Sequence, residues 1–362
     1  MNKVLRVKQK ILERDWRLAL VLSVAFVVVA LFIGYYSNLV IPGNSDPLAR
    51  YSLEPATHLD FMSEWDGPHY LAIAKYGYSN NALTAFFPLY PLLIRLVMFI
   101  INSPLISGLL ISWLCLFGAV YFYIRIIREL ISKDQNIILL GLLLFLFFPT
   151  GIFLAATYTE SLFAFLALGA LFYGLKARVL PATIFSALAT ATHPEGVFVV
   201  ALLGMLLIES KVKPLKIAAA VGGGSLGIVG YIIYLWQSKN RPLDFVGAQK
   251  GSHWLSANYF SVMSGSITVI SALLFILVLI SVFYWWKRRK SLALYSLLFV
   301  LLPLIGGNFA GYSRYSLMAF PMQLMFLDKF NKSRTGYPVV LMLSTILWTF
   351  YVIHYAAGYI GG

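Results

Sequence analysis

Cysteine and charge are both scarce in this chain. It has one cysteine, Cys115, and only 12% of its 362 residues are charged, compared with about a quarter in soluble domains. One cysteine excludes a disulfide framework and a cysteine-based metal site. The HExxH motif of zinc proteases and the GxSxG motif of serine hydrolases are also missing. The GGGS stretch at 222–225 lacks the lysine of a phosphate-binding loop, so we expect its glycines to pack helices against each other.

Long apolar runs dominate what is present. Hydrophobic residues make up 60% of the sequence, and several runs have the roughly 20 residues that a membrane-spanning helix needs. This composition predicts an all-α polytopic membrane protein. The clear runs are 18–41, 105–124, 136–153, 157–175, 215–236, 264–286, 291–308, 315–328 and 338–357.

Two further segments decide the number of spans. The segment 86–100 contains two prolines and Arg95, which favours an amphipathic helix at the outer interface. The segment 179–208 has basic flanks on both sides, so we expect it to cross and return as two legs of about 14 residues, each roughly 21 Å long and shorter than the ~30 Å hydrocarbon core. Its turn, THPEG, is then expected to lie below the outer surface, against protein or water. These choices give one domain, 1–362, with about eleven transmembrane helices in a bundle.

The positive charges predict the orientation of this bundle. Of the 28 lysines and arginines, 21 fall in the N-terminal segment 1–17 and in alternate loops, which the positive-inside rule places in the cytoplasm. With six acids on that side and eight on the other, the inner face carries +15 and the outer face −1. The net charge of +14 therefore needs no nucleic-acid partner. The stretches 42–104 and 237–262 become outer loops, and the outer side receives all five histidines: His58, His69, His193, His253 and His354.

Titratable residues thus gather on one face, whereas a transporter normally has ionisable residues near the bilayer midplane and inverted repeats. No convincing internal repeat is present. An outward-facing site without access to nucleotides needs an activated substrate that is already in the membrane. A lipid-phosphate-linked sugar meets this need.

The segment EWDGPHY at 64–70 begins a set of motifs with a known counterpart. WDGPHYLAIAKYGY, followed by AFFPLYPLL, resembles the family of mannosyltransferases that add the second mannose in glycosylphosphatidylinositol assembly, together with its prokaryotic relatives. FPTGIFLAATYTESLFAFLALGALFY resembles the third and fourth helices of that family, and GYSRYSLMAFP resembles its late Arg-Tyr segment. The resemblance implies a GT-C class glycosyltransferase that uses a polyprenyl-phosphate sugar and inverts the anomeric centre.

The resemblance also implies roles for the acidic residues of the first outer loop. A carboxylate there acts as general base on the acceptor hydroxyl, and Asp66 matches its position. Glu64 and Asp60 are neighbouring candidates; they share a face if 58–66 is helical, or they only solvate the loop. His69 either orients the Asp66 carboxylate, binds phosphate, or is structural.

Other candidate substrate-binding residues lie further along the chain. Arg314 and Tyr315 match the Arg-Tyr pair of the family, and Arg314, at the expected outer start of a helix, is predicted to bind the leaving phosphate unless it only extends to the interface. His193 and Glu195, in the recessed turn, either contact the donor or pair with each other; the family often has an arginine or lysine there. Glu160, beside Tyr158, starts an apolar helix. The set is completed by Trp65 and Tyr78, while Arg241, Asp244, Lys250, His253 and Trp254 are candidates for shaping an acceptor site.

Three hypotheses remain open at this point. The leading one is a mannosyltransferase that acts on a lipid- or glycan-linked acceptor at the outer face of the cell membrane, or at the lumenal face of the endoplasmic reticulum in a eukaryote. The alternatives are a lipid-carrier flippase or transporter and a non-catalytic membrane subunit. The expected co-substrate is the lipid-phosphate sugar, with no other cofactor. Metal dependence stays open because no compact cluster of carboxylates and histidines demands a metal.

Overall fold

The chain folds as an all-α polytopic membrane protein. The computed structural model describes residues 3–41, 58–251, 265–306, 311–331, 333 and 335–359, and these ranges contain helices and turns without strands. The all-α class expected from composition is therefore confirmed. In chain order the elements are α1 (Lys3–Val40), η1 (Asp60–Met62), α2 (Gly67–Tyr76), η2 (Ala82–Ala85), α3 (Leu89–Met98), α4 (Pro104–Leu130), α5 (Gln135–Leu146), η3 (Gly151–Leu154), α6 (Glu160–Leu175), α7 (Val179–Thr192), α8 (Gly196–Glu209), α9 (Pro214–Gly224), α10 (Leu226–Lys239), α11 (Asp244–Gly251), α12 (Gly265–Trp286), α13 (Lys290–Gly306), α14 (Tyr312–Tyr315), η4 (Ser316–Met318), α15 (Phe320–Phe330) and α16 (Gly336–Ala356).

Helix lengths divide the bundle into two groups. Four stretches of the described chain are long and apolar enough to cross a membrane: Arg14–Val40 of α1, α4, Val269–Trp286 of α12, and α16. The pair α9 and α10 makes a fifth if it is counted as one span with a 42° bend. Six further apolar helices have 10–17 residues. The expected count of about eleven stays a prediction, because the shorter helices do not reach spanning length alone.

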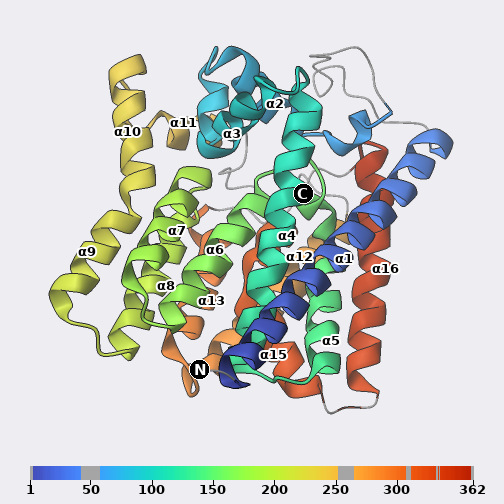
Figure 1. Ribbon diagram of the computed structural model, residues 1–362. Helices are drawn as coiled ribbons and strands as arrows, with labels where there is room; N and C mark the ends of the chain where they lie inside the picture. The colour runs from blue at the N-terminus through green and yellow to red at the C-terminus, as the bar shows by residue number, and fades with distance from the viewer. Residues whose placement is uncertain are drawn as a thin grey trace.

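Acidic side chains join neighbouring helices at the end of the bundle where the chain begins. This end carries the label N in Figure 1. Asp15 of α1 is fully buried and accepts hydrogen bonds from Nε and Nη2 of Arg128 on α4, at 3.1 and 2.7 Å. Glu209, the last residue of α8, accepts from the backbone N–H and the hydroxyl of Ser291 at the start of α13, both at 2.8 Å. Acids at this end therefore fix where neighbouring helices begin and end.

The opposite end carries α2, α3 and the far end of α10 (Figure 1). As expected for the segment 86–100, α3 is short and two-sided, with Tyr90 and Ile94 buried and Leu92 and Leu96 more than half exposed. Tyr90 donates a hydrogen bond to the carbonyl of Gly108 on α4 at 3.0 Å. Ten residues span only about 15 Å, so α3 cannot cross a membrane.

The helices α7 and α8 confirm the two short legs expected in 179–208. Each has 14 residues, and they are joined at 193–195. Gly196, the first residue of α8, lies so close to Ala189 and Thr190 of α7 that a Cβ atom would come within 2.5 Å of their backbone. The glycine of THPEG is therefore required by the close return of the chain.

The expected helix 136–153 is wrong at its end. The helix α5 stops at Leu146, and residues 147–159 form a buried connection that includes η3. Pro149 disfavours helical geometry in the residue before it. Gly151 lies where a Cβ would be 2.2 Å from the carbonyl oxygen of Leu146, so the chain folds back onto the helix end.

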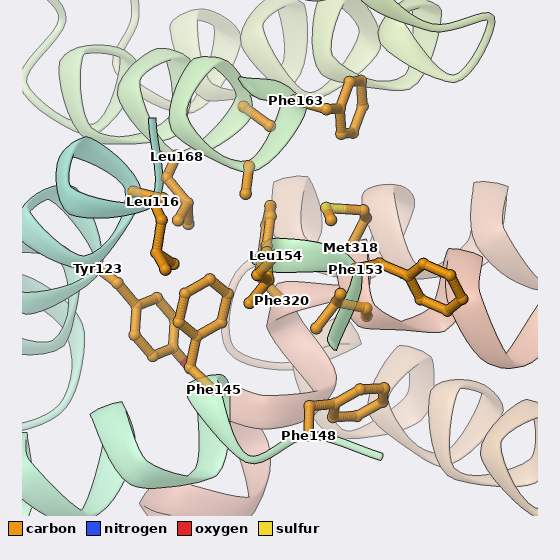
Figure 2. Close-up of a cluster of buried hydrophobic side chains, with 14 of the residues drawn as sticks. Leu116, Tyr123, Phe145, Phe148, Phe153, Leu154, Phe163, Leu168, Met318 and Phe320 are labelled. Carbon is orange, nitrogen blue, oxygen red and sulfur yellow. The ribbon is translucent and has the colours of Figure 1, made fainter. Parts of the chain in front are cut away.

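A cluster of buried aromatic and aliphatic side chains supports this connection. Figure 2 shows Phe153 and Leu154 of η3 among side chains from α4, α5 and α6 and from the segment 316–320. Phe153 and Leu154 are fully buried. The connection 147–159 is thus part of the core, although it is not a regular helix.

The glycines at 222–224 pack helices as expected, and they also precede a break. A Cβ on Gly223 would lie 2.8 Å from Thr183, and one on Gly224 would lie 3.1 Å from Ser186, both on α7. A Cβ on Gly222 would meet nothing within 4 Å. The chain bends between α9 and α10 at Ser225, which tilts α10 relative to α9.

Candidate active site

The segment 62–66 is fixed by hydrogen bonds to distant parts of the chain. The backbone N–H of Thr157 donates to the carbonyl of Met62 at 2.9 Å. The hydroxyl of Tyr158 donates to the carbonyl of Glu64 at 3.0 Å and accepts from the N–H of Asp66 at 3.1 Å. One buried tyrosine therefore satisfies backbone groups on both sides of Trp65 and sets the position of Asp66.

Glu64 differs from what the sequence indicates. Only Asp60–Met62 is helical between 58 and 66, so the helical face proposed for Asp60 and Glu64 does not form. Glu64 is 5% exposed, and its N–H donates to the hydroxyl of Tyr355 at 3.2 Å. The suggestion that Glu64 only solvates a loop is wrong. Trp65 has a φ of +57°, rare for a bulky residue, and is exposed.

Gly67 allows the loop to approach the connection 147–159. A Cβ at this position would lie 2.7 Å from the side-chain oxygens of Ser63 and Thr157. The helix α2 begins here, with Pro68 in its first turn and Asp66 as the preceding residue. Because proline suits the first turn of a helix, the sequence DGP places Asp66 at the end of α2, against the core.

Arg314 reaches the same place from the other end of the chain. It lies in the four-residue helix α14, which follows Gly311 at a φ of +74°. The hydroxyl of Thr150 donates to the carbonyl of Ser313 at 3.0 Å, which joins this segment to the connection 147–159. The expected helix 315–328 begins only at Phe320, so Arg314 is not at the start of a long helix.

The guanidinium of Arg314 bridges two carboxylates. Its Nη1 donates to Oδ2 of Asp66 at 2.7 Å, and its Nε lies 3.1 Å from Oε1 of Glu160. The side chain of Arg314 is 4% exposed, that of Asp66 is 13% exposed and that of Glu160 is 7% exposed. Buried charges are tolerated when they are paired in this way. An arginine that merely extends to the interface is excluded by its burial.

Aromatic rings enclose this triad. The guanidinium carbon lies 5.3–5.6 Å from the ring centroids of Phe153, Tyr158 and Tyr315, within cation–π range. The rings restrict the rotamers of Arg314. The fold therefore brings together four residues that the sequence predicts separately: Asp66, Glu160, Arg314 and Tyr315.

His193 and Glu195 complete one wall of the same region. His193 Nδ1 and Glu195 Oε2 are hydrogen bonded to each other, which confirms the pairing alternative, and the His193 ring packs on Tyr315 at 5.9 Å. Glu160, Arg314, His193 and Glu195 line one cavity. It holds about 10 Å³, barely the space of one water molecule. In this conformation the cavity has no room for a sugar or a phosphate group.

His69 lies beside Asp66 but is not part of the triad. Its ring packs on Phe86 at a centroid distance of 4.9 Å. Burial lowers the pKa of His69, and the nearby Asp66 carboxylate partly opposes this effect. A neutral imidazole is therefore favoured at this position.

The remaining candidates lie elsewhere. Tyr78 donates to the carbonyl of Phe86 at 2.8 Å and packs on Tyr231 of α10, away from the carboxylates. In the loop 237–262, α11 packs against η2 rather than on the triad. His253 and Trp254 lie outside the described residues, as does the side chain of Lys250. Among the described residues, no group of three or more His, Cys, Asp or Glu side chains is arranged to hold a metal ion.

Sequence reasoning missed the residues that hold the loop. Thr157 lies within a family motif but is not a candidate there, and Tyr355 lies outside every motif and is separated from Glu64 by 291 positions. Phe153 packs against the guanidinium of Arg314, but its sequence context indicates only an ordinary core residue. A tyrosine within an apolar run is the one available signal, because a buried hydroxyl needs a hydrogen-bond partner.

Comparison with known proteins adds an independent observation. The profile of the family described as Mannosyltransferase (PIG-V) matches residues 20–215. GPI alpha-1,6-mannosyltransferase 2 of Homo sapiens is 33% identical over 146 residues, covering 37% of this chain and 29% of that protein. The protein of the same name from Cricetulus griseus is 30% identical over 174 residues, covering 42% and 35%.

A more distant relative covers more of the chain. GPI mannosyltransferase 2 of Schizosaccharomyces pombe is 22% identical over 215 residues, covering 52% of this chain and 46% of that protein. The chain thus matches less than half the length of each of these curated relatives. The family match includes Asp66, Glu160 and Glu195 but ends before Arg314.

Proposed function

The chain belongs to the mannosyltransferase (PIG-V) family, and we propose that it is an inverting glycosyltransferase. The donor is a polyprenyl-phosphate mannose, and the acceptor is a lipid- or glycan-linked hydroxyl at the outer face of the membrane. The observation that carries this proposal is the buried Asp66–Arg314–Glu160 triad, in which a carboxylate and a guanidinium meet at one point. A transferase that releases a phosphate needs a base and a cation in this arrangement.

Asp66 is the proposed general base. Its carboxylate takes the proton from the acceptor hydroxyl as that oxygen attacks the anomeric carbon. The new carbon–oxygen bond forms on the face opposite the phosphate, the bond from the anomeric carbon to the phosphate oxygen breaks, and the lipid phosphate leaves with the electron pair. The configuration is inverted because a single displacement occurs.

Arg314 is proposed to stabilise the departing phosphate. A guanidinium binds phosphate oxygens through paired N–H donors, and this one is held by rings and by Glu160. The arriving phosphate competes with Asp66 for Nη1, which frees the Asp66 carboxylate for the acceptor hydroxyl. Glu160 keeps Arg314 in place during this exchange, so it acts as a positioning residue.

The decisive experiment replaces the carboxylate of Asp66 by an amide of nearly the same size and shape. Purified Asp66→Asn is incubated with polyprenyl-phosphate mannose and a mixture of membrane lipids, and the products are analysed by mass spectrometry. We expect transfer to fall about a hundredfold or more, since an amide cannot accept the proton. Asp60→Asn, in the adjoining helix η1 and outside the triad, is the matched control. Wild-type turnover in Asp66→Asn would eliminate this residue as the base.

The same preparation separates the alternatives. A flippase moves the lipid carrier across sealed vesicles without forming a glycosidic bond, and a non-catalytic subunit does neither. Either result with the wild-type protein would overturn the proposed transfer.

A further inference from the structure

A second cavity lies at the other end of α2. It occupies about 440 Å³ between α2, α3 and α10, within the size range of small-molecule and cofactor sites. Its walls include Gly77 and Tyr78 after α2, Leu92 and Arg95 on α3, and Gly230 and Tyr234 on α10. None of these residues belongs to the triad.

One charged group faces an otherwise apolar and aromatic wall. Arg95 is exposed, and its guanidinium has no hydrogen bond or ion pair within the described part of the chain. The hydroxyl of Tyr78 donates a hydrogen bond to the carbonyl of Phe86. The hydroxyl of Tyr231 donates one to the carbonyl of Thr84. Arg95 is therefore the charged group at this cavity that is available to bind an anion.

The rim of the cavity is apolar. Leu92 is 54% exposed and Tyr234 is 44% exposed, and the next turn of α3 presents Leu96, which is 61% exposed. Apolar surface of this kind faces lipid in a membrane protein. A ligand that suits both the rim and Arg95 has one anionic group and a hydrocarbon chain.

Two glycines keep the cavity open. A Cβ on Gly77 or on Gly230 would meet nothing within 4 Å. Gly77 has a φ of +73°, so its backbone conformation also favours glycine. Gly230 lies in the interior of α10, where glycine costs about 1 kcal/mol relative to alanine, and the space beside it is free.

We propose that this cavity binds the lipid anchor of the acceptor, an anionic phospholipid whose phosphate contacts Arg95 and whose chain lies against Leu92 and Tyr234. The identification of this lipid as the acceptor rests on the proposed transferase function. The binding itself does not require catalysis.

Geometry distinguishes the acceptor from the donor. The donor phosphate is bonded to the anomeric carbon, which reacts with the acceptor hydroxyl beside Asp66. The donor phosphate must therefore lie close to the Asp66 carboxylate. The helix α2 has ten residues and spans about 15 Å, and the cavity is at its far end. A phosphate at Arg95 is too far away to be the leaving group. In an acceptor, however, a headgroup separates the reacting hydroxyl from the lipid phosphate.

The test measures lipid binding directly. Purified protein in detergent is titrated with phosphatidylglycerol, and with phosphatidylcholine of the same chains, and bound lipid is counted by native mass spectrometry. We expect Arg95→Gln to bind phosphatidylglycerol about tenfold more weakly, because a charge-assisted hydrogen bond is lost, while Arg95→Lys retains most of the binding. Lys75→Gln removes an exposed positive charge from α2 and is expected to bind normally.

A steric variant tests the cavity without changing charge. Gly230→Leu fills the free space and is expected to weaken phosphatidylglycerol binding as much as Arg95→Gln does. Gly222→Leu places the same side chain in free space on α9, away from the cavity, and should bind as the wild type does. Equal losses in both leucine variants would contradict the proposal, as would normal binding in Arg95→Gln.

A third titration, with polyprenyl phosphate, separates this inference from the transferase proposal. If Arg95→Gln loses polyprenyl phosphate instead of phosphatidylglycerol, the cavity belongs to the donor and our assignment is wrong. Loss of phosphatidylglycerol alone supports the assignment, whether or not Asp66→Asn retains transfer.

Discussion

Arg314 has two buried carboxylate partners, so its removal leaves two unpaired negative charges in the protein interior. Replacing Arg314 by methionine keeps a similar length and removes the cation. We expect the free energy of unfolding to fall by about 3–5 kcal/mol, the usual cost of breaking a buried ion pair. Thermal unfolding in detergent measures this loss.

Charge, rather than packing, is the expected cause. Adding Glu160→Gln to Arg314→Met removes one orphaned carboxylate and should restore part of the stability. Arg95→Gln, which removes an exposed arginine, should leave stability unchanged. If Arg314→Met unfolds at the wild-type temperature, the ion pairs do not contribute as proposed.

His69 gives the protein a pH dependence with a defined sign. Burial lowers the pKa of His69 below its ordinary value of about 6.5. Between the folded and unfolded pKa values the unfolded chain binds more protons, so stability rises with pH across that window and is lost as pH falls below about 6.5. We expect thermal stability to drop on acidification, and His69→Gln to reduce that drop.

His58→Gln is the comparison variant, since His58 is exposed on the same side of the bundle. A wild-type profile in His69→Gln would show that this histidine is not the group responsible.

Among the elements, the connection 147–159 has the largest role in the site. It supplies Tyr158, whose hydroxyl holds two backbone groups of the segment 62–66. We expect Tyr158→Phe to lower the free energy of unfolding by about 1–3 kcal/mol, because a buried carbonyl and a buried N–H lose their partner. Transfer should fall as well, since the base is displaced. Unfolding and mannose transfer are measured on the same preparation.

The matched control is Tyr121→Phe on α4. The hydroxyl of Tyr121 has no hydrogen bond within the described residues, so its loss should change neither quantity. Equal effects of the two substitutions would mean that Tyr158 acts through packing alone.

The two kinds of segment differ in how well sequence predicts them. The legs α7 and α8 follow from apolar runs with charged flanks and a Pro-Glu-Gly turn, and both agree with the structure. The run 136–153 is equally apolar, yet α5 ends at Leu146 because the following proline and glycine redirect the chain. Hydropathy cannot separate a membrane helix from a buried irregular segment, since both exclude water.

The same limit applies to the site. Asp66 and Arg314 are recognisable because each lies in a motif, but their direct contact joins positions 248 residues apart. Glu64 looks solvent-exposed in the sequence because acids usually are. In the structure it is buried, and its backbone N–H donates to the hydroxyl of Tyr355, a partner that no local pattern predicts.

At the scale of the whole molecule, the uneven distribution of lysine and arginine predicts a fixed orientation. With Cys115 replaced by serine, Lys75→Cys should react with a membrane-impermeant maleimide added to intact cells, because the α2 end is predicted to be outside. Lys176→Cys, between α6 and α7, should react only after the membrane is opened. The reverse labelling pattern would place the active site in the cytoplasm.

The surroundings of Arg314 also bear on how the reaction ends. Asp66 and Glu160 flank this guanidinium, and Glu195 lines the same cavity as Glu160 and Arg314. A donor phosphodiester carries one negative charge, whereas the released phosphomonoester carries nearly two at neutral pH. In the proposed mechanism Asp66 holds the acceptor's proton at that moment, so it does not compete for Arg314. Loss of this proton would restore the Asp66 carboxylate, which would then compete with the product phosphate for Nη1 and favour departure of the spent carrier.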